Sequence, residues 1–455
     1  MFWQLFYYLL LTCSSEQCIL TRKMKGKLTL WPLIASIYLM VAGGPFGLED
    51  IVAQMGYRGA LLVLLITPVV WALPSALMVA ELASAIPEEG GYYIWARRAM
   101  GPFAGFMEAW LTLTGSIFDM AIYPTLFVSY LGHFNSAITA GGRGFWIGVA
   151  MLAACALLNL GGAKAVGASS FASTALLLAP FAVLSFYAAT HPGSGTPHAP
   201  AHYDFLLGIL VVMWNYMGYD NSSPIAGEVD RPQRNYPLAM AVTILLVAIS
   251  YVVPIAAVAA TGLSSDQWTT GGWAEVARTV LGGGMMAGAL AAAITVAGMI
   301  GAFGTCNALT MALSRLPAVL AEDGYLPKTF AWRHPKTGAP VVAIFACTLV
   351  WALALNLSFA KLIILDVLLT GLSILMEFAS LIVLRVREPE LPRPYKVPGG
   401  MAGAVGIAIC PVLLLILAMV RNTAEPVGPV NALQLGAILI AAGAGTYFMS
   451  ARARR

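Results

Sequence analysis

The chain has 455 residues, 59% of them hydrophobic and only 10% charged, and its mean hydropathy is +0.81. Soluble globular domains carry roughly 25% charged residues, so this composition excludes a soluble protein and indicates an integral membrane protein. The net charge of +4 does not predict a nucleic-acid partner, because membrane topology accounts for the basic residues.

The first residues are apolar, but they lack the basic leader and small-residue cleavage site of a signal peptide. Met24 opens the segment Met-Lys-Gly-Lys-Leu-Thr-Leu-Trp-Pro and is the more natural start. We therefore predict that residues 1–23 are an extension outside the fold and that residues 24–455 form one transmembrane domain.

Apolar stretches of about 20 residues, the length that crosses a bilayer as a helix, recur along the chain. The two groups of five crossings, about 28–190 and 204–386, are candidate repeats, and two helices over about 403–450 follow them. The predicted fold is an all-α membrane protein with twelve transmembrane helices, near residues 28–54, 60–83, 103–131, 145–162, 168–189, 204–227, 238–261, 284–313, 339–357, 361–385, 403–420 and 432–450.

Lys and Arg concentrate in alternate joints between these crossings. With the N-terminus inside, all but five of the 25 basic residues fall on the inner side. This is the positive-inside rule, so we expect both termini to be cytoplasmic in a multi-pass protein of the cell membrane. The five exceptions are Arg58, Arg143, Arg278, Lys361 and Arg421.

Two crossings contain residues that break a helix at mid-membrane. The first carries Gly43-Gly-Pro-Phe-Gly47, and the sixth carries Trp214-Asn-Tyr-Met-Gly-Tyr-Asp-Asn-Ser-Ser-Pro224. Gly and Pro destabilise helices, and Asn, Asp and Ser compete for backbone hydrogen bonds. Such a pair, five crossings apart, predicts a 5+5 inverted repeat with discontinuous helices 1 and 6 and a binding site between the breaks. Ordinary proline-kinked helices are the alternative.

Acidic residues within the crossings indicate the charge of the ligand. An ionisable group at the centre of a membrane helix costs about 2.5 to 3.5 kcal/mol on the mildest scale. No Lys or Arg lies as deep, so an arriving cation or bound protons must neutralise these acids. We assign a substrate amine to Asp220 first and to Asp119 second. We place Glu108 near a membrane face and leave proton carriage open for Asp366 and Glu377; Glu49 and Asp50 complete the set.

The predicted substrate-binding set combines both breaks with these acids. Its aromatic residues supply apolar or cation-π walls for an alkylammonium group. The set consists of Gly43, Gly44, Pro45, Phe46, Gly47, Glu49, Asp119, Trp214, Tyr216, Tyr219, Asp220 and Asn221.

Further acids lie at the inner ends of crossings two and six. After crossing two, we expect either solvation or ion pairs with Arg97 or Arg98 for Glu81, Glu88 and Glu89. After crossing six, an inner ion-pair gate and simple solvation both remain open for Glu228 and Asp230, which lie near Arg231 and Arg234.

No cofactor, metal site or disulfide framework is predicted. The six cysteines show no paired ligand spacing. Three of the five histidines lie between His191 and His202, where Pro and Gly dominate. We interpret this segment as a flexible solvated loop rather than a metal site.

Several segments together resemble the amino acid, polyamine and organocation (APC) transporters, over the range from Met24 to the tail. A further segment, Ile117-Phe-Asp-Met-Ala-Ile-Tyr-Pro124, and the first break are most similar to the polyamine uptake branch. The segments that carry the resemblance are Gly43-Gly-Pro-Phe-Gly-Leu-Glu-Asp50, Glu81-Leu-Ala-Ser-Ala-Ile-Pro-Glu-Glu-Gly-Gly-Tyr92, Ala226-Gly-Glu-Val-Asp-Arg-Pro232 and Glu322-Asp-Gly-Tyr-Leu-Pro327.

The resemblance implies alternating-access uptake of organic cations such as putrescine or spermidine, coupled to protons, with sodium as the alternative ion. In amino acid members of the family, amides at the first break hold the substrate carboxylate, and Pro45 removes one such donor. Asp220 matches an acid in relatives that move arginine or putrescine. Arg231 departs from the Asn that often precedes the proline. The implied gating or proton-coupling residues are Asp220, Glu228, Glu81 and Tyr92.

The same residues bear on several other functions. An amino acid permease could hold a carboxylate on the amides of Gly43, Gly44 and Gly47. A nutrient sensor or a channel could use the same fold. A membrane enzyme is disfavoured, because no nucleophile and base pair or metal-ligand cluster is present. The expected partners are a small organic cation or amino acid and membrane lipid, and the oligomeric state is left open.

Overall fold

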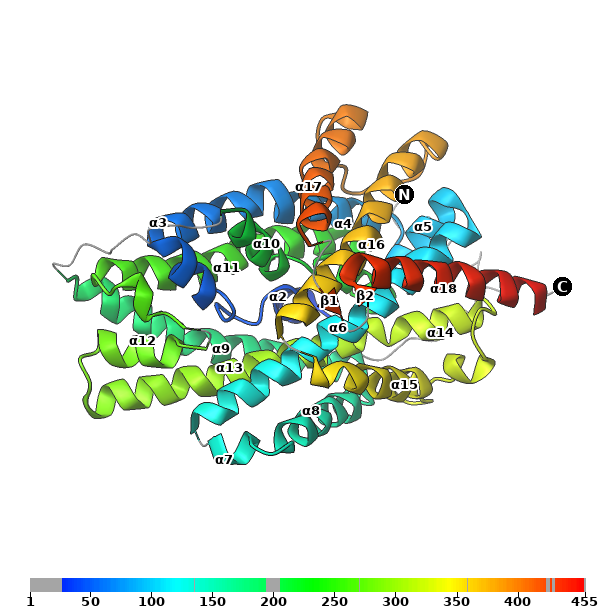
Figure 1. Cartoon of the computed structure of the whole chain (residues 1–455). Helices are drawn as coiled ribbons and strands as arrows, with labels where there is room; N and C mark the ends of the chain where they lie inside the picture. The colour runs from blue at the N-terminus through cyan, green and yellow to red at the C-terminus, as the bar shows by residue number, and fades with distance from the viewer. Residues whose placement is uncertain are drawn as a thin grey trace, which may run out of the picture.

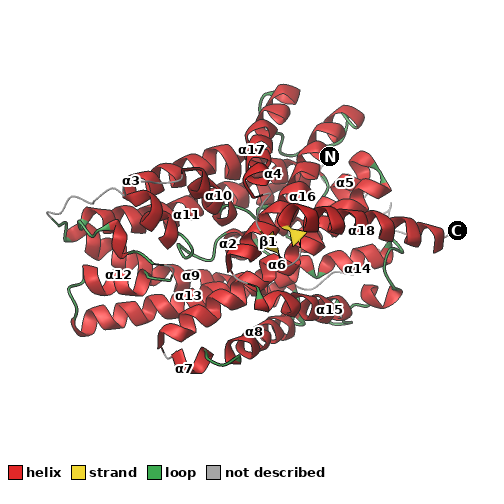
Figure 2. Cartoon of the chain, viewed as in Figure 1, coloured by secondary structure: helices red, strands yellow, loops and turns green. Residues whose placement is uncertain are grey.

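The computed structural model describes residues 27–453 except 135, 194–204, 270, 358, 423–425 and 428–429. Helices form nearly all of the described elements (Figure 2). One short antiparallel pair within these residues joins β1 (Pro426–Val427) to β2 (Val430–Asn431). The predicted extension at residues 1–23, the start at Met24, and His198 and His202 of the histidine loop lie outside the described residues.

The first half of the chain begins with a broken helix. Its two parts are α2 (Leu30–Val41) and the start of α3 (Glu49–Thr67). Within α3 the chain turns at Gly56, whose φ of 66° favours glycine, so the rest of α3 begins the second expected crossing. The following elements are η1 (Pro68–Ala72), α4 (Leu73–Ala85), α5 (Tyr92–Met100), α6 (Pro102–Phe134), α7 (Ser136–Thr139), α8 (Arg143–Asn159) and α9 (Ala163–Thr190).

The second half again begins with a broken helix. Its parts are α10 (Phe205–Asn215) and η2 (Asp220–Glu228), the latter a 3-10 helix. The elements that follow are α11 (Pro232–Ala260), η3 (Ser265–Gln267), α12 (Trp273–Val280), α13 (Gly284–Leu313), α14 (Arg315–Glu322), η4 (Lys328–Ala331), α15 (Val341–Ala352), η5 (Leu353–Asn356), α16 (Phe359–Arg387), α17 (Gly400–Asn422) and α18 (Ala432–Ala453).

Within the described chain, 8 helical segments are long and apolar enough to cross a membrane. Shorter apolar helices accompany them at Leu30–Val41, Arg143–Asn159 and Val341–Asn356. Helices occupy all the ranges expected from the sequence, with ends shifted by a few residues. The all-helical membrane architecture is confirmed, whereas the count of twelve crossings and the inverted relation of the halves stay predictions. The short joint helices α5, α7, α12 and α14 were not expected.

Both predicted breaks are confirmed. Between α2 and α3 the chain leaves the helix, with Gly44 and Gly47 at φ of 86° and 82°. Between α10 and η2 the backbone is again irregular, with Gly218 at φ of 100°. A Cβ on Gly218 would lie 2.4 Å from the carbonyl oxygen of Met40 at the end of α2. Only glycine therefore allows the two breaks to pack so closely.

The breaks lie inside the helical bundle. Helix α2 packs against α9, α11 and α13, and η2 packs against α4 and α13. Figure 1 shows α2 and α10 within the bundle, α7 and α8 along its lower edge and α17 along its upper edge. Protein rather than lipid surrounds the irregular backbone, as its exposed amides require in a membrane.

Candidate functional site

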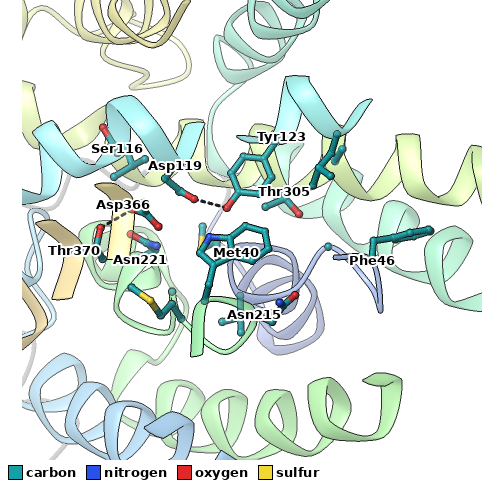
Figure 3. Close-up of a pocket in the computed structure, with 18 of the residues that line it drawn as sticks. Met40, Phe46, Ser116, Asp119, Tyr123, Asn215, Asn221, Thr305, Asp366 and Thr370 are labelled. Atoms are coloured by element: carbon teal, nitrogen blue, oxygen red, sulfur yellow. Dashed lines mark hydrogen bonds between the residues drawn. The ribbon is translucent and has the colours of Figure 1, made fainter. Parts of the chain in front are cut away.

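A cavity of about 50 Å³ lies between the two breaks. This is room for only a few water molecules. Parts of both breaks line it together with α6, α13 and α16 (Figure 3). The lining residues are Met40, Val41, Gly43, Phe46, Thr112, Ser116, Asp119, Tyr123, Leu126, Tyr130, Trp214, Asn215, Met217, Gly218, Asn221, Gly298, Ala302, Thr305, Leu313, Asp366 and Thr370.

Helix α6 presents one continuous face to this cavity. Steps of three and four residues place side chains on the same side of a helix. The residues that α6 contributes follow these steps, and most of them carry a polar oxygen: Thr112, Ser116, Asp119, Tyr123, Leu126 and Tyr130.

Two carboxylates give the cavity an acidic side. Asp119 accepts a hydrogen bond at 2.8 Å from the hydroxyl of Tyr123, and Asp366 accepts one at 2.8 Å from Thr370. Figure 3 shows both acids on the same side of the cavity, and they interact electrostatically. Among the described residues that line the cavity, none is Lys or Arg. The arrangement can therefore hold a cation.

Aromatic residues close the other side. The ring centroid of Phe46 lies 4.9 Å from that of Tyr130 and 5.1 Å from that of Phe181. Figure 3 places Phe46 away from Asp119 and Asp366. Trp214 adds an indole to the lining. These surfaces suit an alkyl chain or the cation-π contact of a second ammonium group.

The predicted binding set is divided by the structure. Gly43, Phe46, Asp119, Trp214 and Asn221 line the cavity. The remaining members do not line it, and their roles in binding stay predictions: Gly44, Pro45, Gly47, Glu49, Tyr216, Tyr219 and Asp220.

Hydrogen bonds to neighbouring helices hold several residues of the two breaks outside the cavity. The hydroxyl of Tyr216 donates to the carbonyl of Leu64 in α3 at 3.2 Å. Trp273 of α12 donates to the carbonyl of Pro45 at 2.8 Å, and Tyr251 of α11 donates to the carbonyl of Asn215 at 2.9 Å. The bonds to Pro45 and Asn215 satisfy backbone oxygens that the broken helices leave free, and the bond to Leu64 satisfies an oxygen that Pro68, which has no N–H, cannot.

Sequence reasoning missed the contribution of α13 and α16. Asp366 was given no place in the binding set, yet it lines the cavity with Thr370. A usable signal existed, because both cavity acids have a hydroxyl residue four positions later, at Tyr123 and Thr370. The α13 residues Gly298, Ala302 and Thr305 are small and carried no such signal.

Three further buried acids, Glu108, Asp220 and Glu377, form what we call the acid cluster. They interact electrostatically with one another and with Tyr92. Glu108 accepts hydrogen bonds from Ser373 at 2.7 Å and from Thr112 at 3.0 Å. Neither carboxylate oxygen of Glu377 has a hydrogen-bond partner among the described residues.

The Glu108 side chain is 0% exposed, because α16 packs against α6, and its expected place near a membrane face stays a prediction. Asp220 begins η2 and is 4% exposed. The acid cluster therefore combines residues of α6, η2 and α16, three elements that also border the cavity. Thr112 links the two, because it lines the cavity and donates a hydrogen bond to Glu108.

Several arginines that belong to α5 or α14, or that contact them, form ion pairs, among them Arg97, Arg315 and Arg333. We call this end of the bundle the basic end, and Figure 1 shows α5 and α14 at the end away from α12. Glu81 is 0% exposed there and accepts a hydrogen bond from Arg385 at 2.8 Å, with Arg393 at 3.3 Å. The expectation that Glu81 is solvated or paired with Arg97 or Arg98 is wrong. Those two arginines pair instead with Asp323 and Glu388.

Glu228 also has a different partner from the one expected. It pairs with Arg315 at 3.0 Å, not with Arg231 or Arg234, and so joins the end of η2 to α14. This ion pair fits the gate alternative better than simple solvation. Tyr92 of α5 also contacts η2, because its backbone N–H donates to the hydroxyl of Ser223 at 3.2 Å.

Glu89 belongs to the same group of charges. It pairs with Arg333 at 2.7 Å rather than with Arg97 or Arg98, and Arg333 also contacts Glu322. Burial raises the pKa of Glu89, although the charge of Arg333 acts in the opposite direction. Glu88, in contrast, is exposed, as solvation predicts.

Helix α2 and the 3-10 helix η2 are joined at the basic end. Leu28, just before α2, forms a parallel bridge with Val229, just after η2. The N–H of Leu28 donates to the carbonyl of Glu228 at 2.9 Å, and the N–H of Asp230 donates to the carbonyl of Leu28 at 2.8 Å. Backbone bonds thus connect α2 and η2 outside their own helices.

Comparison with known proteins extends these observations. The family model described as amino acid permease matches residues 32–442. The chain is 33% identical over 412 residues to polyamine transporter PUT1 of Oryza sativa subsp. japonica, covering 90% of this chain and 75% of the relative. It is 35% identical over 410 residues to a probable polyamine transporter of Arabidopsis thaliana, covering 88% and 83%. Polyamine transporter RMV1 of the same plant is 31% identical over 410 residues, covering 86% and 79%.

Proposed function

The chain belongs to the amino acid permease family, and we propose that it is a secondary active transporter that takes up polyamines such as putrescine or spermidine. Membership confirms the resemblance to APC transporters and excludes the membrane enzyme. The chain is an integral, multi-pass membrane protein.

The observation that carries the proposal is the pair Asp119 and Asp366. Both carboxylates border a small cavity between two helix breaks, and no lining residue in the described part of the chain carries a positive charge. An alkylammonium group would neutralise them, and the aromatic side at Phe46 would take the rest of a diamine. The relatives named polyamine transporters support this substrate class.

Proton coupling is the second part of the proposal. The acid cluster has no basic partner among the described residues, and Glu377 has two free carboxylate oxygens. Protonation is the simplest way to keep such buried groups neutral. In this scheme the basic end faces the cytoplasm, and Asp220, Glu108 and Glu377 exchange protons with the cytoplasm through it. Glu81, Glu228 and Tyr92 hold that end closed.

An amino acid permease is the second candidate. The backbone N–H groups of Gly43 and Gly44 donate to no acceptor in the described residues. Amides at a helix break are suitable donors for a substrate carboxylate. In that case the buried acids would serve protons alone.

Uptake into reconstituted vesicles tests the proposal. With an imposed inward proton gradient, we expect saturable uptake of labelled putrescine, and a sodium gradient should not replace it. Asp366→Asn keeps the side-chain shape but removes one charge, so the KM for putrescine should rise on the order of 100-fold. Asp266→Asn, at an exposed position in η3, is the matched control and should leave uptake unchanged.

The competing functions give different results in the same vesicles. Competition by single amino acids but not by putrescine or spermidine would favour the permease. Uptake that does not saturate would indicate a channel, and ligand binding without net flux would indicate a sensor. An unchanged KM in Asp366→Asn would remove this residue from the site.

A further inference from the structure

The start of α3 is an anion-binding end of a helix. The N-terminus of a helix carries free N–H groups and partial positive charge, and both attract carboxylates. This end of α3 follows directly on the first break and lies at its junction with the cavity residue Phe46. A substrate carboxylate entering the break would meet it.

This end is already occupied by a side chain of the protein itself. The Oε2 atom of Glu49 accepts a hydrogen bond at 2.6 Å from the backbone N–H of Gly47. The Glu49 side chain is 1% exposed, and its Oε1 atom has no hydrogen-bond partner among the described residues. Gly47 lies in the break, just before the N-cap residue Leu48, so the Glu49 carboxylate occupies a backbone amide beside the start of α3.

Gly47, whose amide binds the Glu49 carboxylate, lies against two residues of the cavity wall. A Cβ placed on Gly47 would lie 3.5 Å from the Trp214 ring and 3.9 Å from the amide oxygen of Asn215, and both residues line the cavity. Glu49 also interacts electrostatically with the lining residue Tyr130. A second carboxylate at this wall would find the Gly47 amide already taken by the Glu49 carboxyl group.

We propose that Glu49 is a built-in carboxylate that occupies the anion-binding end of α3 and selects amines over the amino acids that carry the same amine chain. The inference rests on the proposed uptake of organic cations and names the feature that sets its specificity. Pro45, which has no N–H, leaves the break with fewer donors for any competing carboxylate.

Substrate pairs that differ by one carboxylate give the sharpest test. Ornithine is putrescine with an added carboxylate, and lysine is cadaverine with the same addition. The measured quantity is the ratio of half-inhibitory concentrations, ornithine over putrescine, for uptake of labelled putrescine by reconstituted protein. Lysine over cadaverine repeats the measurement.

Three variants separate the contributions of charge and hydrogen bond. Glu49→Ala frees the Gly47 amide and removes the charge, so the ratio should fall about tenfold. Glu49→Gln removes the charge but keeps an acceptor on that amide, so the fall should be smaller. Asp266→Asn, at an exposed position in η3, is the control, and its ratio should stay within about twofold of the native value.

Each outcome decides the matter. An unchanged ratio in folded Glu49→Ala or Glu49→Gln overturns the inference, and so does an equal fall in Asp266→Asn. If Glu49→Ala does not fold, Glu49→Gln decides alone, and ligand-induced thermal stabilisation of purified protein by putrescine or ornithine replaces uptake. Native protein that putrescine does not inhibit would instead refute the proposed function itself.

Discussion

Glu81 at the basic end and Glu377 in the acid cluster are both 0% exposed, yet their surroundings are opposite. Glu81 contacts two arginines, Arg385 and Arg393, and accepts the N–H of Val397 at 2.7 Å. Glu377 has neither an ion pair nor a hydrogen bond among the described residues. Burial alone therefore does not distinguish the structural carboxylate of Glu81 from Glu377, which we propose carries a proton; their partners do.

The largest effect on stability is expected from Glu81→Gln. The neutral amide would leave the charges of Arg385 and Arg393, whose side chains are 3% and 6% exposed, without a counter-charge. Breaking a buried pair in this way costs about 3 to 5 kcal/mol. Thermal and denaturant unfolding of the purified variant should show this loss. Native-like midpoints would mean that the pair is not needed to hold the basic end together.

A Glu to Gln substitution at Glu377 in the acid cluster should have the opposite effect on stability. Glu377→Gln removes an unpaired buried acid without changing its shape, so stability should be unchanged or higher. Proton-driven accumulation of putrescine should be lost, while exchange of external for internal putrescine should continue. Parallel measurements with and without the proton gradient check this. Full accumulation in the variant would assign proton coupling elsewhere.

The smallest effect is expected at the edge of the basic end, where Arg98 pairs with Glu388 at 2.7 Å and both side chains are about one-third exposed. Hydrogen bonds from Arg98 lower the pKa of Glu388 below its ordinary value of 4.5. The pair therefore stabilises the fold above that pH and loses this contribution as the pH falls through the lowered pKa. Arg98→Gln should cost less than about 1 kcal/mol at neutral pH.

A comparison of melting temperatures at neutral and acidic pH checks this last prediction. The difference between the native protein and Arg98→Gln should shrink as Glu388 becomes protonated. A difference that grows on acidification would contradict the sign. A neutral-pH loss as large as that of Glu81→Gln would remove the distinction between exposed and buried pairs.

Local features of the fold were accessible from the sequence, and long-range ones were not. Gly43, Pro45 and Gly218 signal a break wherever they occur in an apolar run, because their effect on the backbone is local. The partner of Glu81 lies 304 positions away at Arg385, and that of Glu228 lies 87 positions away at Arg315. Nearby arginines were the natural expectation and were wrong, because helix packing rather than chain proximity brings charges together.

The same limit applied to the candidate site. The acids could be found because charge in an apolar run is conspicuous. Whether Asp366 faces the cavity and whether Glu108 is covered by another helix depend on how α16 rotates against α6, and the hydropathy of these helices does not encode that rotation. Glu49 was expected in the binding set, but its bond to Gly47 required the irregular backbone to be seen.

In a transporter that couples its substrate to protons, as we propose for this chain, the bridge between Leu28 and Val229 would limit leakage. If α2 and η2 opened separately at the basic end, each could release a substrate without its proton, or a proton without its substrate. Separation would break two backbone hydrogen bonds, at 2.9 Å and 2.8 Å, each contributing about 1 kcal/mol. The bridge favours a single concerted opening, and tight stoichiometry would then follow from a contact that touches neither substrate nor proton.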